Sequence, residues 1–217
     1  MSSAQTDISR EPRGRGPSPD KTAQTRHAIV SAALDTFLER GFQATRMIDV
    51  AERAGVAKGT LYLYFADKQA LFEGVLGEVI AAPVSIVRAV TPDEGESVRD
   101  FLVRTVVPLM RNMESSRRAA VLRLVIAEGA RFPELAATYR RLAIEPLYAL
   151  IRRLAQLAAE RGEIASDALT RYPMLMLAPG LTASVWNGLF GLREPVDTGS
   201  VFEAYVDLVF GPSGGRH

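Results

Sequence analysis

A tight turn at Gly55 constrains the fold of this chain more than any other feature of its sequence. The turn, Ala54-Gly55-Val56, separates two stretches with a helical apolar pattern, 45–54 and 57–64. Glycine adopts a positive φ without strain, so a sharp reversal between two helices is expected here. The second helix is only about eight residues long, and a helix that short is marginal alone in water. Neighbouring helices must therefore hold it in place.

The short helix divides into an inner and an outer face. At about 100° per residue, Leu61 and Phe65 point back toward the preceding helices. Four residues fall on the outer side: Gly59, Thr60, Tyr62 and Leu63. This is the arrangement of a helix-turn-helix, whose second helix presents its N-terminal half to a DNA groove. A glycine turn between two helices is also common in proteins that do not bind DNA, so the geometry alone leaves both interpretations open.

The side chains on and after this helix are suited to DNA. Lys58 and Thr60 lie at a helix N-terminus, where backbone N–H groups favour phosphate. Tyr62 and Tyr64 offer hydroxyl groups to phosphate and ring faces to sugars or thymine methyl groups. Lys68, in the first turn of the next helix, is expected to bind a further phosphate. The absent side chain of a glycine would let the helix backbone approach DNA closely.

The stretch GFQATRMIDVAERAGVAKGTLYLYFADKQALF resembles the N-terminal DNA-binding domain of the TetR/AcrR transcriptional regulators, over about residues 25–75. Many members of that family have Arg or Lys where this chain has Ile48, and Arg46, half a turn away, is expected to supply that phosphate contact. Thr45 would cap the second helix beside the DNA backbone. The resemblance implies DNA-binding roles for Thr45, Arg46, Lys58, Gly59, Thr60, Tyr62, Leu63, Tyr64 and Lys68. A weaker resemblance to one large TetR subgroup covers residues 117–163.

The whole chain is expected to be helical, because no alternating strand pattern with hairpin chemistry occurs in its 217 residues. Residues 1–21, rich in Ser, Gly, Pro and Arg, are expected to form a disordered arm. Residues 22–75 would form the helix-turn-helix domain, with Thr25 capping its first helix. By the family resemblance, residues 76–217 would form a larger helical regulatory domain for ligand binding and dimerisation.

Composition excludes several kinds of active site. The chain has no cysteine and only two histidines, His27 and His217, which argues against thiolate catalysis, a Ser-His-Asp triad and histidine-rich metal sites. It also lacks a Glu-x-x-His motif and a phosphate-binding loop. No enzymatic activity, cofactor or metal is therefore expected. The first residues lack the apolar run of a signal peptide, and no stretch approaches about 20 uninterrupted apolar residues, so a cytoplasmic protein without a membrane partner is expected.

Two C-terminal segments combine small and bulky apolar residues, GLTASVWNGLFG (180–191) and VFEAYVDLVF (201–210). With their symmetry mates they would form an isologous four-helix interface of a homodimer. The residues expected at this interface are Trp186, Leu189, Phe190, Phe202, Tyr205 and Val209. The same helices could instead close the core of their own domain.

Adaptable methionines and polar aromatic side chains are the candidates for a small-molecule site. The set is Met110, Met113, Arg123, Tyr139, Tyr148, Met174, Trp186 and Asn187. Such residues at helical spacing are also typical of a core. Arg123 and Glu128 share a very apolar stretch, where they would either meet a charged effector or form a buried pair with each other.

The leading functional interpretation is a homodimeric repressor of a near-palindromic operator that a small apolar effector releases from DNA. The alternatives are an activator or co-repressor-dependent regulator, an enzyme with a helical catalytic domain, and a helical adaptor without sequence preference. The net charge of +1 does not by itself indicate a DNA-binding protein. The helix from Asp67 to about Val90, bent at Pro83, is expected to be the only connection between the two domains and so to carry the switch.

Overall fold

The computed structural model describes residues 19–212, and every regular element within them is a helix. The N-terminal part contains α1 (Pro19–Ala44), α2 (Met47–Ala54) and α3 (Lys58–Tyr64), followed by α4 (Lys68–Leu76), the π-helical turn η1 (Gly77–Ala81) and α5 (Ala82–Ala89). The remainder contains α6 (Val98–Thr105), α7 (Val107–Arg111), α8 (Arg118–Glu128), α9 (Pro133–Tyr139), the π-helical turn η2 (Arg140–Ile144), α10 (Glu145–Glu160), α11 (Ala168–Arg171), α12 (Met174–Phe190) and α13 (Thr198–Phe210). The expected all-helical fold is confirmed.

The first helix begins earlier than the sequence indicates. Residues 1–18 of the expected disordered arm lie outside the described residues, whereas 19–21 already belong to α1. Thr25 therefore lies inside the helix, where its hydroxyl donates to the carbonyl of Lys21 at 2.8 Å. Thr25 is a residue of the second helical turn and not an N-cap.

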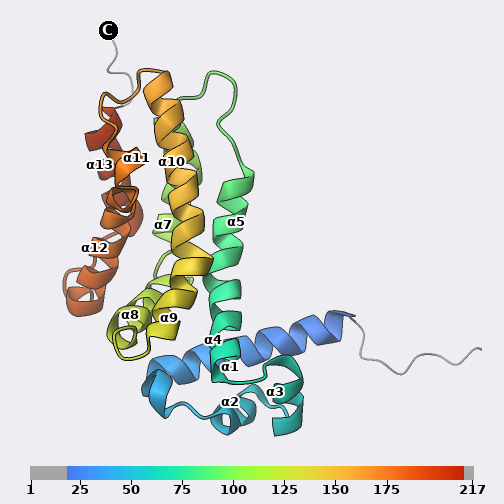
Figure 1. Cartoon of the computed structure of the whole chain (residues 1–217). Coiled ribbons are helices and arrows are strands. Elements are labelled where there is room, and N and C mark those ends of the chain that lie inside the picture. The colour runs from blue at the N-terminus through green and yellow to red at the C-terminus, as the bar shows by residue number, and fades with distance from the viewer. Residues whose placement is uncertain (1–18, 213–217) are drawn as a thin grey trace, which may run out of the picture.

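The helices α1 to α3 form an N-terminal unit at the lower end of the molecule (Figure 1). Its core joins Phe37 of α1, Val50 of α2 and Leu61 of α3, all fully buried. Gly55 caps α2 with a φ of 68°, as the turn predicted from the sequence requires. Gly41 also has a positive φ, 75°, and kinks the end of α1 so that Phe42 returns to the core.

A long helical rod formed by α4, η1 and α5 rises from the N-terminal unit beside α10 (Figure 1). The helices α9, η2 and α10 form a second rod. Each rod contains one π-helical turn, and η1 and η2 lie in contact. Each turn ends two residues before a proline, Pro83 or Pro146. Proline has no N–H and its ring collides with the carbonyl four residues earlier, so the regular α pattern cannot pass through it unchanged. The bend expected at Pro83 is thus a π-helical turn just ahead of it.

The core divides into two clusters along the long axis. The first spreads from the N-terminal unit into α4, η1, α8 and α9. The second is built around Phe101, Leu154 and Phe202, and joins α5 to α6, α7 and α10 to α13. The paired π-helical turns contribute Ile80 and Ala143 to the first cluster, close to the boundary with the second. Effects that pass from one cluster to the other therefore cross a region of altered helix geometry.

One helical stretch of the described residues, Lys68–Ala89, is apolar and long enough to cross a membrane by length and composition, with a mean hydropathy of 1.7. Glu73 and Glu78 interrupt this stretch, so it does not contradict the expectation that no run of about 20 uninterrupted apolar residues occurs. The stretch is the connecting rod, and its side chains from Leu71 to Ile80 enter the first core cluster, while Val87 enters the second. Packing against α1, α9 and α10 accounts for its apolar character.

Candidate functional site

The outer face of α3 is the most exposed apolar surface of the N-terminal unit. Leu61 and Phe65 anchor this seven-residue helix in the core, as their spacing predicts. Tyr62 is 44% exposed and Leu63 is 86% exposed. The helix lies at the end of the molecule farthest from α12 and α13 (Figure 1). An exposed leucine of this kind costs free energy unless a partner covers it.

The polar groups of α3 surround that apolar surface. Lys58 and Gly59 are exposed, and the Lys58 ammonium lies over the Tyr62 ring, 5.9 Å from its centroid. Thr60 is half-buried. Tyr64 is also half-buried and packs against the first core cluster, so less of its ring is available than the sequence indicates. Five of the predicted positions on α3 are thus brought together on one exposed face, with Tyr64 at its edge.

Lys68 does not belong to this face. Its Nζ donates hydrogen bonds to three carbonyl oxygens, those of Phe42 (2.7 Å), Gln43 (3.0 Å) and Thr45 (3.1 Å). An ammonium group has three N–H donors, so none is left for a phosphate. Burial lowers the pKa of the Lys68 ammonium, and Glu128 opposes that shift. This side chain closes the end of α1 in the structure, and its predicted contact with phosphate stays a prediction.

Thr45 also has a structural role in place of the predicted one. It is buried, and its hydroxyl donates to the carbonyls of Gly41 at 2.8 Å and Thr36 at 3.3 Å. The N-cap residue of α2 is Arg46, without a side-chain capping bond. Thr45 therefore fixes the kinked end of α1 and does not cap α2. Arg46 is exposed at the start of α2, which agrees with its predicted position.

A buried carboxylate that was not among the predicted site residues lies beside Arg46. Asp49 accepts from Arg46 Nη2 at 2.6 Å and Nε at 3.0 Å, and forms an ion pair with Arg40 Nη1 at 2.8 Å. The Arg46 hydrogen bond is the largest cause that lowers the pKa of Asp49 to about 2. Asp49 is therefore ionised at neutral pH, between two guanidinium groups. The i, i+3 spacing of Arg46 and Asp49 is the one sequence signal for this pair.

The residues predicted to bind an effector are not gathered around one cavity. Tyr139 packs against the first core cluster, where burial raises the pKa of its hydroxyl to about 12. Met110 packs in the second cluster, and Met113 and Tyr148 are half-buried. Met174 is exposed. These five residues occupy separate parts of the helical assembly.

The other three predicted effector residues make polar contacts around α12. Arg123 of α8 pairs with Glu114 at 3.1 Å and also donates to the carbonyl of Ser184. Trp186 Nε1 donates to the carbonyl of Glu194 at 2.9 Å, and the Asn187 amide exchanges two hydrogen bonds with the backbone of Val196. The predicted alternative of a buried Arg123–Glu128 pair is wrong, because Glu128 turns toward α1 instead.

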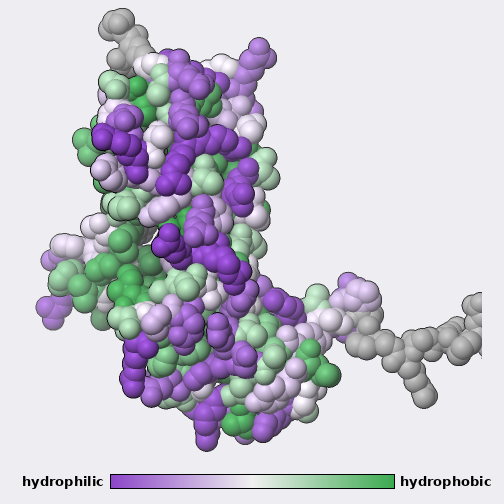
Figure 2. Space-filling model, viewed as in Figure 1, coloured by the Kyte–Doolittle hydropathy of each residue, from purple (hydrophilic) through white to green (hydrophobic). Residues whose placement is uncertain are grey.

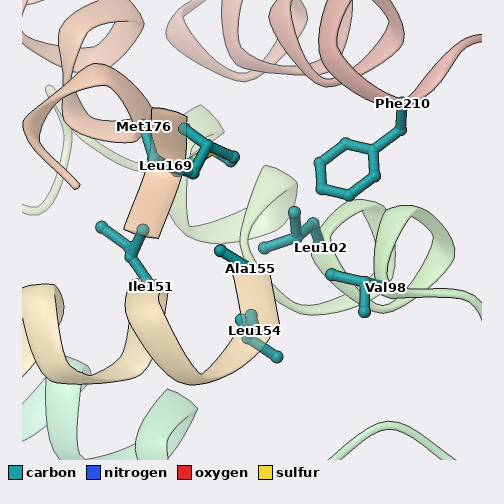
Figure 3. A pocket seen from close by; sticks show the side chains of 8 residues that line it. All are labelled: Val98, Leu102, Ile151, Leu154, Ala155, Leu169, Met176 and Phe210. Carbon is teal, nitrogen blue, oxygen red and sulfur yellow. The ribbon is translucent and has the colours of Figure 1, made fainter. Parts of the chain in front are cut away.

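Two hollows in the regulatory helices differ in size. One is a cavity of about 10 Å³ in the second core cluster, with an apolar lining (Figure 3). It has room for about one water molecule. Its lining is Val98, Leu102, Ile151, Leu154, Ala155, Leu169, Met176 and Phe210. The other is open to the surface at the end of α12, has a volume of about 480 Å³ and is lined by Trp186, Leu189, Phe190, Leu192, Arg193 and Glu194.

An exposed apolar surface runs along α12, seen as a green patch at the lower left of Figure 2. Leu181, Val185 and Leu189 follow one another at helical spacing on it, together with Trp186 and Phe190. We call these five residues the α12 face. Three of them, Trp186, Leu189 and Phe190, are positions predicted for the dimer interface. Leu181 and Val185 were not selected, although their i, i+4 spacing with Leu189 was available in the sequence.

The residues predicted for the interface on α13 pack toward the core of their own domain. Phe202 is only 3% exposed, and Tyr205 and Val209 pack with it in the second core cluster. The outward apolar residue of α13 is Leu208. The alternative that this stripe closes the core of its own domain is the one that the structure supports. Apolar residues on both sides of α13 made the choice of face ambiguous.

The N-terminal unit contacts the regulatory helices at more places than the connecting rod. Arg117, which precedes α8 with a positive φ of 66°, pairs with Asp35 of α1. Glu128 at the end of α8 accepts from the Phe42 backbone N–H at 3.3 Å. The expectation that the rod alone joins the two parts is therefore wrong.

Comparison with known proteins identifies two regions of similarity. Residues 29–75 match the family described as bacterial regulatory proteins, tetR family, and residues 91–209 match the tetracyclin repressor-like C-terminal domain. The chain is 32% identical to the HTH-type transcriptional regulator YdeS of Bacillus subtilis (strain 168), over 87% of this chain and 75% of that protein. It is 28% identical to the HTH-type transcriptional repressor BepR of Brucella suis biovar 1 (strain 1330), over 76% of this chain and 82% of that protein.

The fold is also that of a solved structure. Salmonella enterica GusR superimposes with a TM-score of 0.69 and 24% identity, over 92% of this chain and 100% of that chain. At that level of identity the likeness concerns the fold alone. The relatives matched in sequence are transcriptional regulators and not enzymes.

Proposed function

Since this chain belongs to the tetR family of bacterial regulatory proteins, we propose that it is a cytoplasmic homodimeric repressor that a small apolar molecule releases from its operator. The family membership makes the chain a DNA-binding transcriptional regulator. The observation that carries the proposal for this molecule is the outer face of α3, where Tyr62 and Leu63 are exposed beside Lys58 and Gly59. No other large apolar side chain of the described N-terminal unit is as exposed as these two.

On this proposal α3 enters the major groove. Leu63 and the ring of Tyr62 contact thymine methyl groups or sugars, while Thr60 and the Tyr62 hydroxyl form hydrogen bonds. Lys58 at the start of α3 pairs with phosphate. Gly59 allows the helix backbone to come near the DNA, and a Cβ added there meets no protein atom within 4 Å, so the space in front of it is open. Domain boundaries at about 22–75 and 76–217 would follow from these roles.

The dimer is supported by the α12 face. Five large apolar side chains exposed along one side of a helix are costly in water, and a second copy of the same helix would bury them in an isologous interface. Two protomers related in this way would present two copies of α3 to half-sites about 34 Å apart, which requires a near-palindromic operator. Arg123 and Glu114 flank this face with polar contacts.

The effector is supported by the open hollow at the end of α12. Its volume of about 480 Å³ falls in the range of small-molecule sites, about 300–1,000 Å³, and four of its six lining residues are apolar or aromatic. A ligand there releases DNA only if it binds the DNA-free conformation more tightly. Because Trp186 and Leu189 belong to both the hollow and the α12 face, a bound ligand would alter the relation between the two protomers.

In vitro selection from a random duplex library tests the proposed function. We expect the protein to enrich a near-palindromic sequence, and Thr60→Ala or Tyr62→Ala to weaken binding to it by about 1–3 kcal/mol. Ile86→Ala is the control, because Ile86 is an exposed apolar residue on α5, outside the N-terminal unit. Recovery of no common sequence, or equal effects of all three variants, would refute the proposal.

A further inference from the structure

The start of α2 carries two arginines that share one carboxylate. Asp49 has a side chain only 7% exposed, whereas the side chains of Arg46 and Arg40 are 72% and 50% exposed. The carboxylate accepts two hydrogen bonds from Arg46, at 2.6 and 3.0 Å, and forms an ion pair with Arg40 at 2.8 Å. With Asp49 ionised, the group of three carries a net charge of +1 at the protein surface. We call it the arginine fork.

The geometry leaves donors of both arginines available. Arg46 uses Nε and Nη2 on Asp49, which fixes the plane of its guanidinium group and leaves Nη1 outside the pair. Arg40 uses Nη1, which leaves its Nε and Nη2. In the described part of the chain, neither arginine forms a salt bridge to a second carboxylate. The guanidinium groups of Arg46 and Arg40 therefore both contact the buried Asp49 carboxylate and still have N–H groups free to bind an anion.

A cation at this place is unfavourable unless an anion approaches. Arg46 is the N-cap residue of α2, and it makes no capping bond through its side chain. Helix N-termini carry partial positive charge and unpaired N–H groups, so they disfavour a cation and favour an anion. Asp49 in the first turn offsets part of this repulsion. The net positive charge of the fork and the partial positive charge of the helix terminus both favour binding of an anion such as phosphate.

The fork lies at the start of α2, close to the start of α4. The carbonyl of Thr45, adjacent to Arg46, accepts from Lys68, the first residue of α4. Lys68 follows Tyr64, the last residue of α3, by four residues. Arg53, in contrast, lies in the last turn of α2 and pairs with Glu39 of α1. The two ends of α2 therefore face different surroundings.

We propose that Asp49 is a positioning residue that holds Arg46 and Arg40 as a phosphate clamp at the start of α2. The inference rests on the proposed DNA binding and adds a second, sequence-independent contact to the one made by α3. Arg46 and Arg40 bind the DNA backbone and set the register of the protein, while α3 contacts the bases. Asp49 itself does not touch DNA. It removes the freedom that two long exposed side chains would otherwise have to lose on binding.

A salt titration with two duplexes tests whether Arg46 contacts phosphate. Phosphate contacts do not depend on base sequence, so binding is measured to the selected operator and to a scrambled duplex of equal length. Arg46→Ala should weaken both, and should lower the slope of log K against log salt by about 0.9 for each protomer. Arg46→Lys keeps the charge but not the fork, so it should retain the slope and lose affinity. Arg53→Ala is the matched control on the same helix and should change neither quantity.

A double-mutant cycle separates positioning from a merely structural role. Asp49→Asn should weaken binding to both duplexes by roughly tenfold, about the contribution of one charge-assisted hydrogen bond. In the Arg46→Ala, Arg40→Ala background the same change should cause no further loss. An equal loss in both backgrounds would overturn the proposal, as would an unchanged salt slope in Arg46→Ala. If Asp49→Asn lowers the melting temperature below the assay range, Asp49→Glu, which keeps the carboxylate but moves it, replaces it in the cycle.

These outcomes can be distinguished from failure of the proposed function. Loss of all duplex binding by the wild-type protein would refute DNA binding and the clamp together. Normal wild-type binding with no effect of the Arg46 and Asp49 variants would refute the clamp alone. Selective loss of operator binding without loss of scrambled-duplex binding would also refute it, because a phosphate contact affects both.

Discussion

At the scale of single residues, the two lysines of the DNA-binding region have different roles that their sequence positions do not reveal. Lys58 and Lys68 both lie in the first turn of a helix. Lys58 is exposed with its ammonium over Tyr62, whereas Lys68 donates to three carbonyl oxygens at the end of α1. The difference arises because Gly41 kinks α1 and turns its last carbonyls toward α4, a tertiary feature that no local pattern contains.

This difference gives opposite expectations for the same substitution. Lys68→Met should lower the free energy of unfolding by about 1–3 kcal/mol, because it leaves buried carbonyls without a charged donor. It should leave the salt slope of DNA binding unchanged. Lys58→Met should change the free energy of unfolding by less than about 0.5 kcal/mol and should flatten the salt slope. Denaturant unfolding and salt titration of both variants check these two expectations. A flattened salt slope in Lys68→Met would instead indicate that Lys68 binds a DNA phosphate.

The periodicity of α3 was sufficient to predict which of its residues are exposed. Leu61 and Phe65 are buried and Tyr62 and Leu63 are exposed, as 100° per residue requires. Thr45 and Asp49 were beyond such reasoning. Their roles depend on which atoms of α1 lie opposite them, and spacing within α2 carries no information about that. A single sequence therefore defines the face of a helix more reliably than the hydrogen bonds of a polar residue at its end.

At the scale of elements, α8 is a second connection between the regulatory helices and the N-terminal unit. It begins after Arg117, which pairs with Asp35, and ends at Glu128, which accepts from the Phe42 N–H. Both contacts lie on α1, so a shift of α8 along its axis would move α1 directly. Arg117 is the only non-glycine residue of the described chain with a positive φ, and this conformation costs about 1 kcal/mol or more. The pair with Asp35 holds it there.

The role of α8 in effector response is open to direct test. Apolar molecules are first screened by the fluorescence of Trp186, the one tryptophan of the chain, which lines the open hollow. A ligand found in this way should lower operator affinity by about 5–150-fold, equal to a coupling of about 1–3 kcal/mol. Arg117→Ala should reduce that factor without abolishing ligand binding, because it breaks the α1–α8 contact.

Arg104→Ala is the control for this experiment. Arg104 also forms a salt bridge, to Glu96, but within the regulatory helices and away from α1. It should leave the coupling factor unchanged. An equal reduction by both variants would mean that general loosening, and not the α8 contact, explains the effect. Ligands that leave operator affinity untouched would refute the switch itself.

At the scale of the whole molecule, the order and type of the helices were predictable, but their mutual packing was predictable only in part. Helical periodicity without strand patterns was enough for the all-helical fold, and Gly55 for the turn between α2 and α3. The sequence did not show which face of α13 is buried, because apolar residues occur on all sides of this helix. Val206 and Phe202 are buried, while Leu208 is exposed. The π-helical turns depend on a pair of prolines in neighbouring rods, a coincidence that is visible only in the folded chain.

Assembly is tested by placing charge on the α12 face. Leu189 is 71% exposed, so Leu189→Glu costs little in the folded protomer but would bury a charge in a dimer. We expect folded monomers that bind the operator poorly. Ile86→Glu, at a site 67% exposed on α5, is the matched control and should remain dimeric. Phe202→Glu, in contrast, should unfold the protein, since Phe202 is in the second core cluster. Monomers from the Ile86 variant as well would argue against the α12 face as the interface.

The central claim, a homodimer that binds one operator through two copies of α3, is tested most directly by sedimentation equilibrium of the wild-type protein with and without the selected duplex. The account predicts twice the 23.6 kDa mass of the chain at micromolar concentration, and a complex of two chains on one duplex whose half-sites lie about 34 Å apart. A free mass of one chain, together with one chain on each duplex, would contradict it.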